Sequence, residues 1–136
     1  MDIMELKGKT AIVTGGGRGI GEGIARVLAR EGANVVVMGR HVDEVEAVAG
    51  SISDSGGHAI AVVADVTRWD SLLAMTDLAV RQFGGVDILV NNAGIEAPPC
   101  LLADLPAEQW DAVLGVNLKG VFLCCKYVLP TMVSAK

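Results

Sequence analysis

The chain has 136 residues, of which 51% are hydrophobic, 20% charged and 4% aromatic, and its net charge is −5. The high apolar and modest charged fractions exclude a disordered chain, and the acidic balance argues against a nucleic-acid partner. The length suits one domain with one core, so residues 1–136 are expected to form a single domain.

Apolar runs alternate with segments of helical periodicity along the chain. The first pair is a strand over Lys9–Thr14 and a helix over Gly19–Arg30, which Gly32 ends. The apolar residues that share one face of this helix are Ile20, Ile24, Val27 and Leu28.

Three further strands and two helices continue the alternation. In order, they are a strand over Val35–Met38, a helix over Asp43–Ser53, a strand over Ile60–Ala64, a helix running to about Phe83 and a strand over Val86–Val90. Thr67 or Asp70 is expected to cap the helix before Phe83. This β-α-β-α-β-α-β order predicts right-handed crossovers and a three-layer α/β fold, with helices on both faces of a parallel sheet.

A loop over Gly94–Leu105 and an apolar helix complete the chain. Pro106 suits the first turn of this helix, and Pro130 is expected to end or kink it. Its apolar stripe consists of Trp110, Val113, Leu114, Val121, Cys124 and Val128. No unbroken apolar run reaches the ~18 residues of a membrane helix, so no membrane partner is expected.

The cysteines and the N-terminus indicate a compartment. Cys100, Cys124 and Cys125 are odd in number and lack C-x-x-C spacing, which favours a reducing environment and small buried side chains over disulfides. Met1–Lys9 is mixed and charged, unlike a signal peptide. A cytoplasmic location is therefore expected.

The first strand leads directly into a glycine-rich turn, Thr14–Gly21, with the pattern T-G-x-x-x-G-x-G. Glycines let backbone amides approach a phosphate, the next helix directs its positive end there, and Arg18 adds a charged donor. The turn residues expected to bind a nucleotide are Gly15, Gly17, Arg18, Gly19, Ile20 and Gly21. The alternative is a tight strand–helix turn that needs glycine only for packing.

The spacing of this turn resembles the short-chain dehydrogenase/reductase family, because the G-x-G-x-x-G pattern would place its third glycine on Ile20. The resemblance extends from Lys7 to about Pro130. Asp65-Val66 resembles the family's adenine clamp, in which Asp65 accepts from the adenine amino group and the Val66 backbone faces the ring. Read alone, Asp65 could equally be a loop acid.

Asn91-Asn92-Ala93-Gly94 looks like the family's N-N-A-G motif. The resemblance implies that Asn91 ties down the carboxyl edge of the sheet, while Asn92, Ala93 and Gly94 border the cofactor ribose.

Asn117 lies within the apolar stripe of the last helix, where a buried amide costs roughly 1–3 kcal/mol unless it is hydrogen-bonded. In the family, the asparagine of an N-L-K-G-V-F-like segment belongs to the catalytic tetrad and holds a water that links to the catalytic lysine. The alternative is a structural asparagine in a kinked helix.

The end of the second strand indicates the cofactor. NAD binders place an acid there, whereas this chain has Gly39 followed by Arg40 and His41. Glycine leaves room for a 2′-phosphate and arginine pairs with it, with Arg18 approaching the same group. We therefore expect NADP(H) to be preferred over NAD(H). A solvated Arg40 is the alternative.

The family's serine, tyrosine and lysine follow the Asn117 helix, and the chain ends at Lys136 before them. Tyr127, the only tyrosine, is followed four residues later by Thr131 and is expected to be a packing residue. The fold is thus expected to be truncated after the fourth strand and following helix. The fourth strand becomes an exposed edge, and the 136-residue chain alone is expected to be inactive and to be unstable or to associate. A fragment, a truncated reading frame, a partly described protein and one part of an obligate assembly all remain open.

Two functions remain after this reasoning. The first is an oxidoreductase that transfers hydride between NADP(H) and a small-molecule carbonyl or secondary alcohol, in a homo-oligomer. The second is a non-catalytic nucleotide-binding module or remnant. A methyltransferase of related fold is disfavoured, because it would want an acid at Gly39 and a different glycine spacing.

Overall fold

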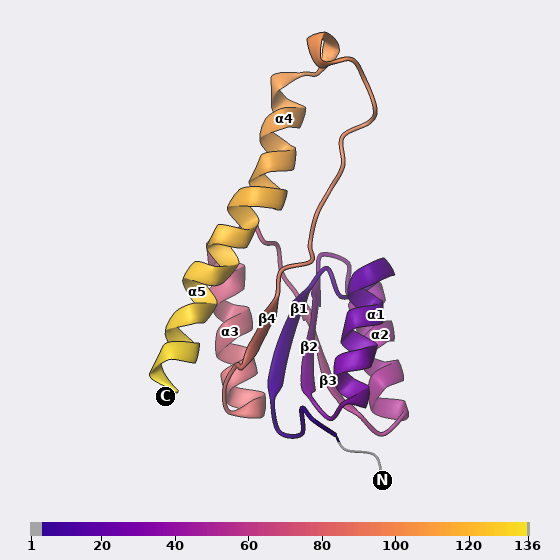
Figure 1. The fold of residues 1–136 in the computed structure, drawn as a ribbon, viewed down its shortest axis with the longest axis vertical. Helices are drawn as coiled ribbons and strands as arrows, with labels where there is room; N and C mark the ends of the chain where they lie inside the picture. Colours follow the sequence, from indigo (N-terminus) through magenta and orange to yellow (C-terminus); the bar gives the residue numbers. More distant parts are fainter. Residues whose placement is uncertain (1–3, 136) are drawn as a thin grey trace.

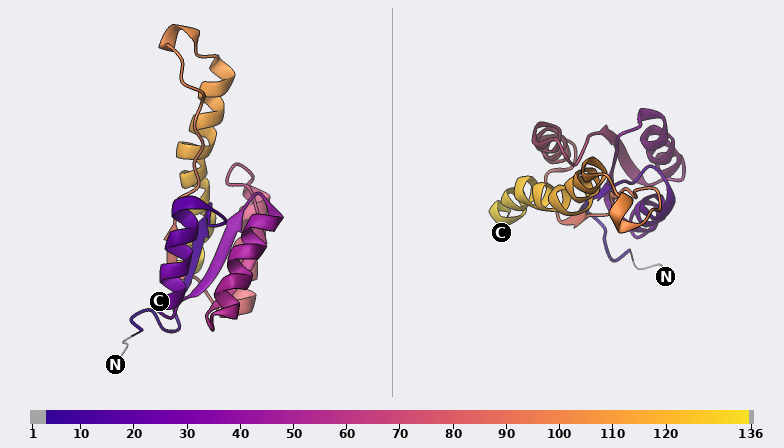
Figure 2. Two further views of the ribbon diagram at one scale, coloured as in Figure 1. Left: turned by 90° about the vertical axis from the view of Figure 1, so that its right-hand side faces the viewer. Right: turned by 90° about the horizontal axis from the view of Figure 1, so that it is seen from above.

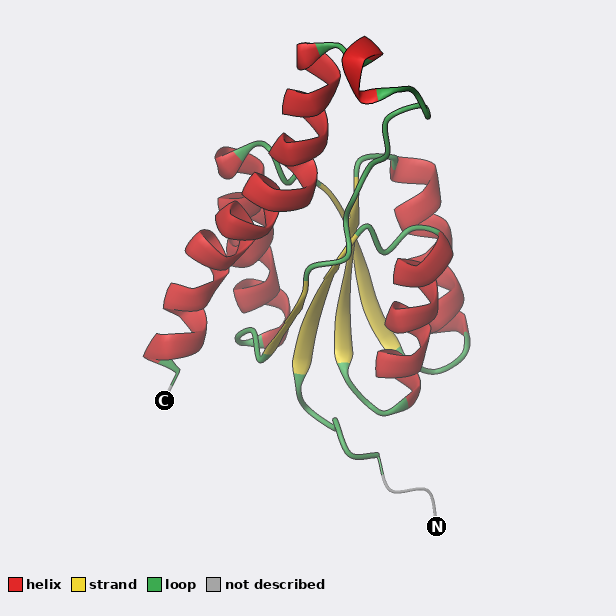
Figure 3. Cartoon of the chain, turned by 45° about the horizontal axis from the view of Figure 1, so that its top comes forward, coloured by secondary structure: helices red, strands yellow, loops and turns green. Residues whose placement is uncertain are grey.

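The computed structural model describes residues 4–135 and contains a four-stranded parallel sheet between two helical layers (Figures 1 and 3). The strands are β1 (Thr10–Thr14), β2 (Asn34–Gly39), β3 (His58–Val63) and β4 (Ile88–Val90). Their order in the sheet is β3-β2-β1-β4, and every pairing is parallel. The expected α/β fold is confirmed. The start of the Met1–Lys9 segment and Lys136 lie outside the described residues.

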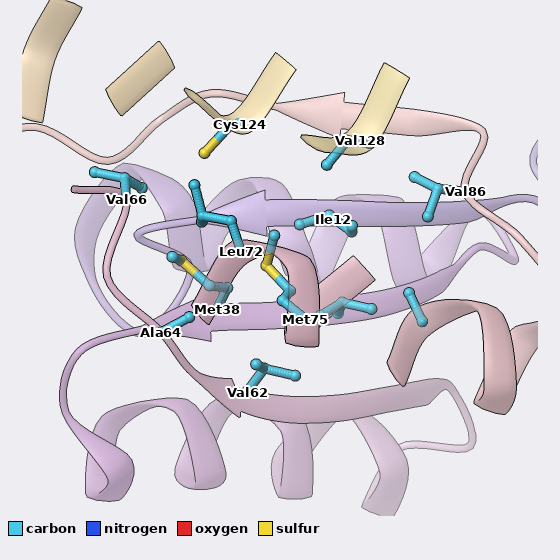
Figure 4. Packing of buried hydrophobic residues seen from close by; sticks show 12 residues of the cluster. Ile12, Met38, Val62, Ala64, Val66, Leu72, Met75, Val86, Cys124 and Val128 are labelled. Carbon is cyan, nitrogen blue, oxygen red and sulfur yellow. The ribbon is translucent and has the colours of Figure 1, made fainter. Parts of the chain in front are cut away.

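Helices cover both faces of the sheet, as Figure 2 shows from the side and from above. Helices α1 (Gly19–Arg30) and α2 (Val42–Asp54) pack on one face, where Val13, Val35 and Val37 are buried. Helix α3 (Trp69–Phe83) and the C-terminal helix pack on the other, around Ile12, Val36 and Met38 (Figure 4). Alternate residues of each central strand therefore enter opposite clusters, as expected for strands buried on both faces.

Helix α1 has the predicted bounds, and its apolar face is only partly buried. Its buried residues are Gly21, Ala25 and Ala29, while Ile20 is 78% exposed and Val27 is 47% exposed. Ile24 and Leu28 are partly buried against the core. Periodicity identifies residues by apolar character, whereas the fully buried residues of this helix are small ones.

The predicted side-chain cap of α3 is absent. The N-cap residue is Arg68, and no side-chain hydrogen bond caps the helix. Thr67 donates instead to Asp65, and Asp70 lies within the first turn of the helix, paired with Arg68. Gly84 ends the helix in the left-handed conformation, with φ of 87°.

A short 3₁₀ turn, η1 (Leu102–Asp104), precedes a continuous helical stretch. This stretch consists of α4 (Ala107–Leu114), a π-helical segment η2 (Gly115–Lys119) and α5 (Gly120–Ser134). Pro106 is its N-cap, while Pro130 lies inside α5, so the helix does not end there as one prediction had it. The part nearer α4 projects beyond the sheet (Figure 1).

Only α5, the C-terminal part of this helical stretch, has fully buried residues. Cys124 and Val128 join Leu72 and Met75 in the core cluster of Figure 4, whereas Trp110, at the start of the predicted stripe, is 53% exposed. The other large apolar side chains exposed on this helix are Leu114, Leu118, Phe122, Leu129 and Val133.

By length and composition alone, the stretch Ala107–Ser134 could cross a membrane, because an 18-residue window within it has a mean hydropathy of 1.6. The sequence expectation counted unbroken apolar runs, whereas this window tolerates interruptions: Lys119 and Lys126 are the only charged residues among residues 112–135. One such helix is weak support for a membrane location, because core helices meet the same test.

Tyr127 is a packing residue, as predicted. Its ring stacks on Trp69 with centroids 6.0 Å apart and is partly buried against the core. The cysteines behave less uniformly than expected: Cys124 is buried, Cys125 is half-buried and Cys100 is exposed. Burial, together with the adjacent Cys125, raises the pKa of the Cys124 thiol to about 11, so this thiol stays neutral near pH 7.

Strand β4 lies at an edge of the sheet, as predicted. Its ladder with β1 begins at Ile88, two residues later than the predicted strand. Before that point the Asp87 carboxylate accepts the Thr10 N–H at 2.8 Å, and the Asp87 N–H donates to the Thr10 carbonyl at 2.9 Å. A side chain thus takes the place of a ladder bond at the start of this strand.

Candidate functional site

A cavity of about 290 Å³ opens at the carboxyl ends of the strands. Crevices at this edge are where open α/β sheets bind ligands. Every residue predicted to bind a cofactor lines it except Gly21, namely Gly15, Gly17, Arg18, Gly19, Ile20, Arg40, His41, Asp65, Val66, Asn92, Ala93 and Gly94. Sequence motifs separated by up to about 80 residues therefore meet around one space.

The glycine turn places unpaired backbone donors beside this cavity. Gly15 and Gly19 have φ of 63° and 57°, values that side-chain-bearing residues rarely adopt. Helix α1 begins at Gly19, so the amides of its first turn have no partner within the helix. A Cβ on Gly19 would meet nothing within 4 Å, which leaves open space in front of these donors. The arrangement suits an anion such as a phosphate.

Gly21 is needed for packing rather than for space in the cavity. A Cβ at this position would collide with the Gly15 carbonyl oxygen and with Asn92 Nδ2. Gly17 also packs closely, because its Cβ would lie 3.0 Å from the Glu44 Cβ and 3.2 Å from Val45 Cγ1. Gly17 and Gly21 therefore fit the packing alternative for this turn, whereas open space remains at Gly19.

Thr14 and Asn92 join the ends of β1 and β4. The Thr14 Oγ1 accepts the N–H groups of Asn92 and Ala93, each at 3.0 Å, and donates to the Val90 carbonyl at 3.3 Å. Asn92 Nδ2 donates to the Thr14 and Gly15 carbonyls at 3.0 and 3.1 Å. The adjoining amides and carbonyls are thereby satisfied at the base of the cavity.

The predicted role of Asn91 therefore belongs to its neighbour. Asn91 is exposed, and among residues 4–135 its side-chain amide contacts only Cys125 Sγ, at 3.6 Å. Successive residues leaving a strand point in opposite directions, and Asn92 is the one directed toward β1. Within residues 4–135, the asparagine side-chain hydrogen bonds that tie β4 to β1 therefore come from Asn92 rather than from Asn91.

Asp65 is held as an ionised carboxylate at the end of β3. Burial raises its pKa, but hydrogen bonds from the Thr67 N–H (2.9 Å) and Oγ1 (2.7 Å), with the charges of Arg40 and Arg68, outweigh burial and lower it. Both bonds reach Oδ1, and Oδ2 accepts no hydrogen bond from residues 4–135. One oxygen is therefore left to accept from a ligand.

Two guanidinium groups border the end of the cavity beside β2. Arg18 and Arg40 line the cavity and are exposed, and within residues 4–135 neither has a carboxylate within 4.0 Å. Gly39 lies between Met38 and Arg40, and a Cβ on it would already lie 3.0 Å from Val45 Cγ1. This end offers two positive charges that a dianionic group could bind.

Asn117 lies outside the cavity, on η2, and it is exposed rather than buried. Its Oδ1 accepts the Ile95 N–H at 2.8 Å, and its Nδ2 donates to the Ile95 carbonyl at 2.9 Å. The argument from a buried amide was wrong because the helix projects past the sheet at this point. Asn117 still reaches the site indirectly, because Ile95 lines the cavity.

Sequence reasoning missed several residues of the cavity wall. Glu44, Ile95 and Val116 line it but belong to no motif. Glu44 gave one signal, since it is an acid in the first turn of the helix that follows Arg40. Ile95 and Val116 gave none, because Ile95 lies in a loop whose backbone bonds the Asn117 side chain, and Val116 lies in the π-helical segment η2.

The short chain dehydrogenase family model matches residues 9–136. Among curated proteins, the chain is 45% identical over 129 residues to a 3-oxoacyl-acyl-carrier-protein reductase of Staphylococcus epidermidis, covering 94% of this chain and 52% of that protein. It is 42% identical over 134 residues to 3beta-hydroxysteroid dehydrogenase 1 of Eggerthella lenta, covering 97% and 51%. The chain thus spans about half the length of the curated relatives it matches.

A solved structure gives the same result for the fold. The crystal structure of a short-chain type dehydrogenase/reductase from Mycobacterium marinum superposes with a TM-score of 0.92 at 36% identity. The match covers 99% of this chain and 56% of that one.

Proposed function

The chain belongs to the short-chain dehydrogenase family, and we propose that it forms the NADP(H)-binding half of an oxidoreductase that acts on a small-molecule carbonyl or secondary alcohol. The observation that carries the proposal is the single cavity around which the glycine turn, Asp65, Arg40 and Asn92 meet. When bound, the cofactor supplies or accepts the hydride.

The residues of the cavity divide the binding of a dinucleotide among them. The amides that begin α1 and the Arg18 side chain would bind the phosphates. Asp65 Oδ2 would accept from the adenine amino group, with Val66 beside the ring. Asn92, Ala93 and Gly94 would border the ribose. The open space at Gly19 and the ionised Asp65 support this fit.

Preference for NADP(H) rests on Arg40, Arg18 and Gly39. NAD(H) binders place an acid near the end of this strand, where it accepts from the ribose hydroxyls, whereas a guanidinium pairs with a 2′-phosphate. Arg40 has no ion-pair partner within residues 4–135, so a ligand phosphate would not have to displace one. His41 follows on the cavity wall.

The test is equilibrium binding of NADPH and NADH to the chain by titration calorimetry. We expect tighter binding of NADPH. Arg40→Gln should weaken NADPH binding about tenfold, the loss of one charge-assisted pair, while NADH binding stays within about twofold. Arg30→Gln, an exposed change in the last turn of α1, is the matched control. Equal or tighter NADH binding by the unmodified chain would contradict the preference.

The second candidate is nucleotide binding without turnover by these 136 residues. It is favoured by Tyr127, the only tyrosine, whose ring is stacked on Trp69 and is not on the cavity wall. Incubation of the chain and NADPH with a panel of ketones, followed at the NADPH absorbance, separates the candidates. We expect binding without oxidation. Oxidation by the chain alone would refute this candidate.

Asn117 is proposed to contribute to the catalytic groups of the whole protein. Its amide already forms two hydrogen bonds with Ile95, and each of its two polar atoms can form one more.

We propose in addition a homo-oligomer, to which the exposed apolar side chains of α4 and α5 would contribute, and a cytoplasmic location. The three free cysteines support the latter.

A further inference from the structure

The first turn of α2 closes the end of the cavity at which Arg18 and Arg40 lie. The Glu44 Cβ lies 3.0 Å from the position that a Cβ on Gly17 would occupy, and Val45 Cγ1 lies 3.0 Å from the equivalent position on Gly39. Glu44 is therefore held against the glycine turn, is partly buried, and lines the cavity.

The two carboxylates of the cavity wall differ in how they are engaged. Asp65 accepts two hydrogen bonds from Thr67 and lies in the field of Arg40. Glu44 accepts no hydrogen bond and has no cation within 4.0 Å among residues 4–135. Its negative charge is therefore not offset by a direct partner and acts on whatever occupies this end of the cavity.

We propose that Glu44 is a specificity-determining residue that limits the preference for NADP(H). The inference rests on the function proposed above, in which Arg18 and Arg40 bind the 2′-phosphate. A carboxylate in the same cavity repels that phosphate, which carries close to two negative charges at pH 7. NAD(H) has a hydroxyl at this position, so Glu44 opposes its binding much less. Glu44 thus allows NAD(H) to compete at a site whose arginines favour the 2′-phosphate.

A purely structural role for Glu44 makes a different prediction. An acid in the first turn of a helix stabilises it through the helix dipole, and α2 has two, Asp43 and Glu44. Asp43 is exposed and does not line the cavity. Asp43→Asn therefore removes the same charge from the same turn one residue away, which makes it the matched control for Glu44→Gln.

The experiment measures dissociation constants of the 136-residue chain for NADPH, NADH, 2′,5′-ADP and 5′-AMP by titration calorimetry. The two adenosine fragments isolate the 2′-phosphate from the nicotinamide half of the ligand. Glutamine keeps the side-chain length of Glu44, so packing against Gly17 is retained, and thermal unfolding of each variant checks the fold. Glu44→Lys serves as a second variant, because it reverses the charge.

We expect Glu44→Gln to tighten binding of NADPH and 2′,5′-ADP about fivefold, the size of one partly screened charge interaction. Binding of NADH and 5′-AMP should change by less than about twofold. Glu44→Lys should extend the effect in the same direction, and Asp43→Asn should leave the ratio of NADH to NADPH dissociation constants unchanged.

Two failures are distinguishable. If the unmodified chain binds NADPH and NADH but Glu44→Gln and Glu44→Lys shift both ligands equally or neither, Glu44 does not set specificity and the inference is wrong. If the unmodified chain binds none of the four ligands, the proposed function is wrong and the inference falls with it.

Discussion

Helix α1 and the C-terminal helix α4–α5 pack on opposite faces of the sheet and bury different kinds of residue. Helix α1 contacts the sheet through Gly21, Ala25 and Ala29. The C-terminal helix buries Cys124 and Val128, and most of its large apolar side chains remain exposed. Burial thus follows the distance between a helix and its neighbour rather than the apolar character of a stripe.

Helix α1 packs so closely against the glycine turn that one added methyl group should disrupt the contact. Gly21→Ala places a Cβ on the Gly15 carbonyl oxygen and Asn92 Nδ2, which are fixed by backbone and hydrogen bonds. We expect the free energy of unfolding to fall by about 3 kcal/mol, measured by urea denaturation.

Gly23→Ala is the control for this change on the same helix. A Cβ there meets nothing within 4 Å, so the better helix propensity of alanine should stabilise the chain by about 0.5–1 kcal/mol. Equal effects of the two substitutions would show that α1 does not depend on close approach.

The C-terminal helix offers the same residue type in two environments. Val128 is 0% exposed and Val133 is 65% exposed, both within α5. Val128→Ala should lower the free energy of unfolding by about 2 kcal/mol, from the lost burial and the cavity left behind. Val133→Ala should change it by less than about 0.5 kcal/mol. Similar losses at both positions would mean that the exposed half of the helix is covered in solution.

The smallest expected effect concerns pH. Because the pKa of Asp65 is lowered from its ordinary value of 3.8, its ionised form stabilises the fold above that value. The contribution is lost as pH falls below about 4, toward the folded-state pKa. Asp65→Asn should therefore flatten the acid limb of a plot of stability against pH. An unchanged acid limb would show that the Thr67 hydrogen bonds do not favour the carboxylate.

The sequence predicted those features of the fold that depend on local pattern. The parallel sheet and the bounds of α1 followed from alternation and glycine punctuation. In α2, the apolar residues at helical spacing, Val45, Val48, Ala49 and Ile52, are all buried. The buried face of α1 could not be predicted in the same way, because a stripe of small residues has a weak hydrophobic signal.

The candidate site was predictable where a motif fixes the backbone and not where a side chain selects its partner. The glycine turn was found from spacing alone. Asn91 and Asn92 are chemically identical in the sequence, and only the direction of the chain after β4 decides which one bonds Thr14. The contacts of Asn117 and Glu44 depend on tertiary structure. Asn117 bonds Ile95, 22 residues away in the sequence, and Glu44 packs against Gly17 from helix α2.

The paired hydrogen bonds between Asn117 and Ile95 have a mechanical consequence. A side-chain amide here satisfies both the donor and the acceptor of one backbone residue, as a neighbouring strand would. Ile95 forms part of the cavity wall, and Asn117 stands on the projecting helix. The helix lines the cavity directly through Val116, and these two bonds also join it to the wall at Ile95, so a tilt of the helix is transmitted to the start of the Gly94–Leu105 loop as well.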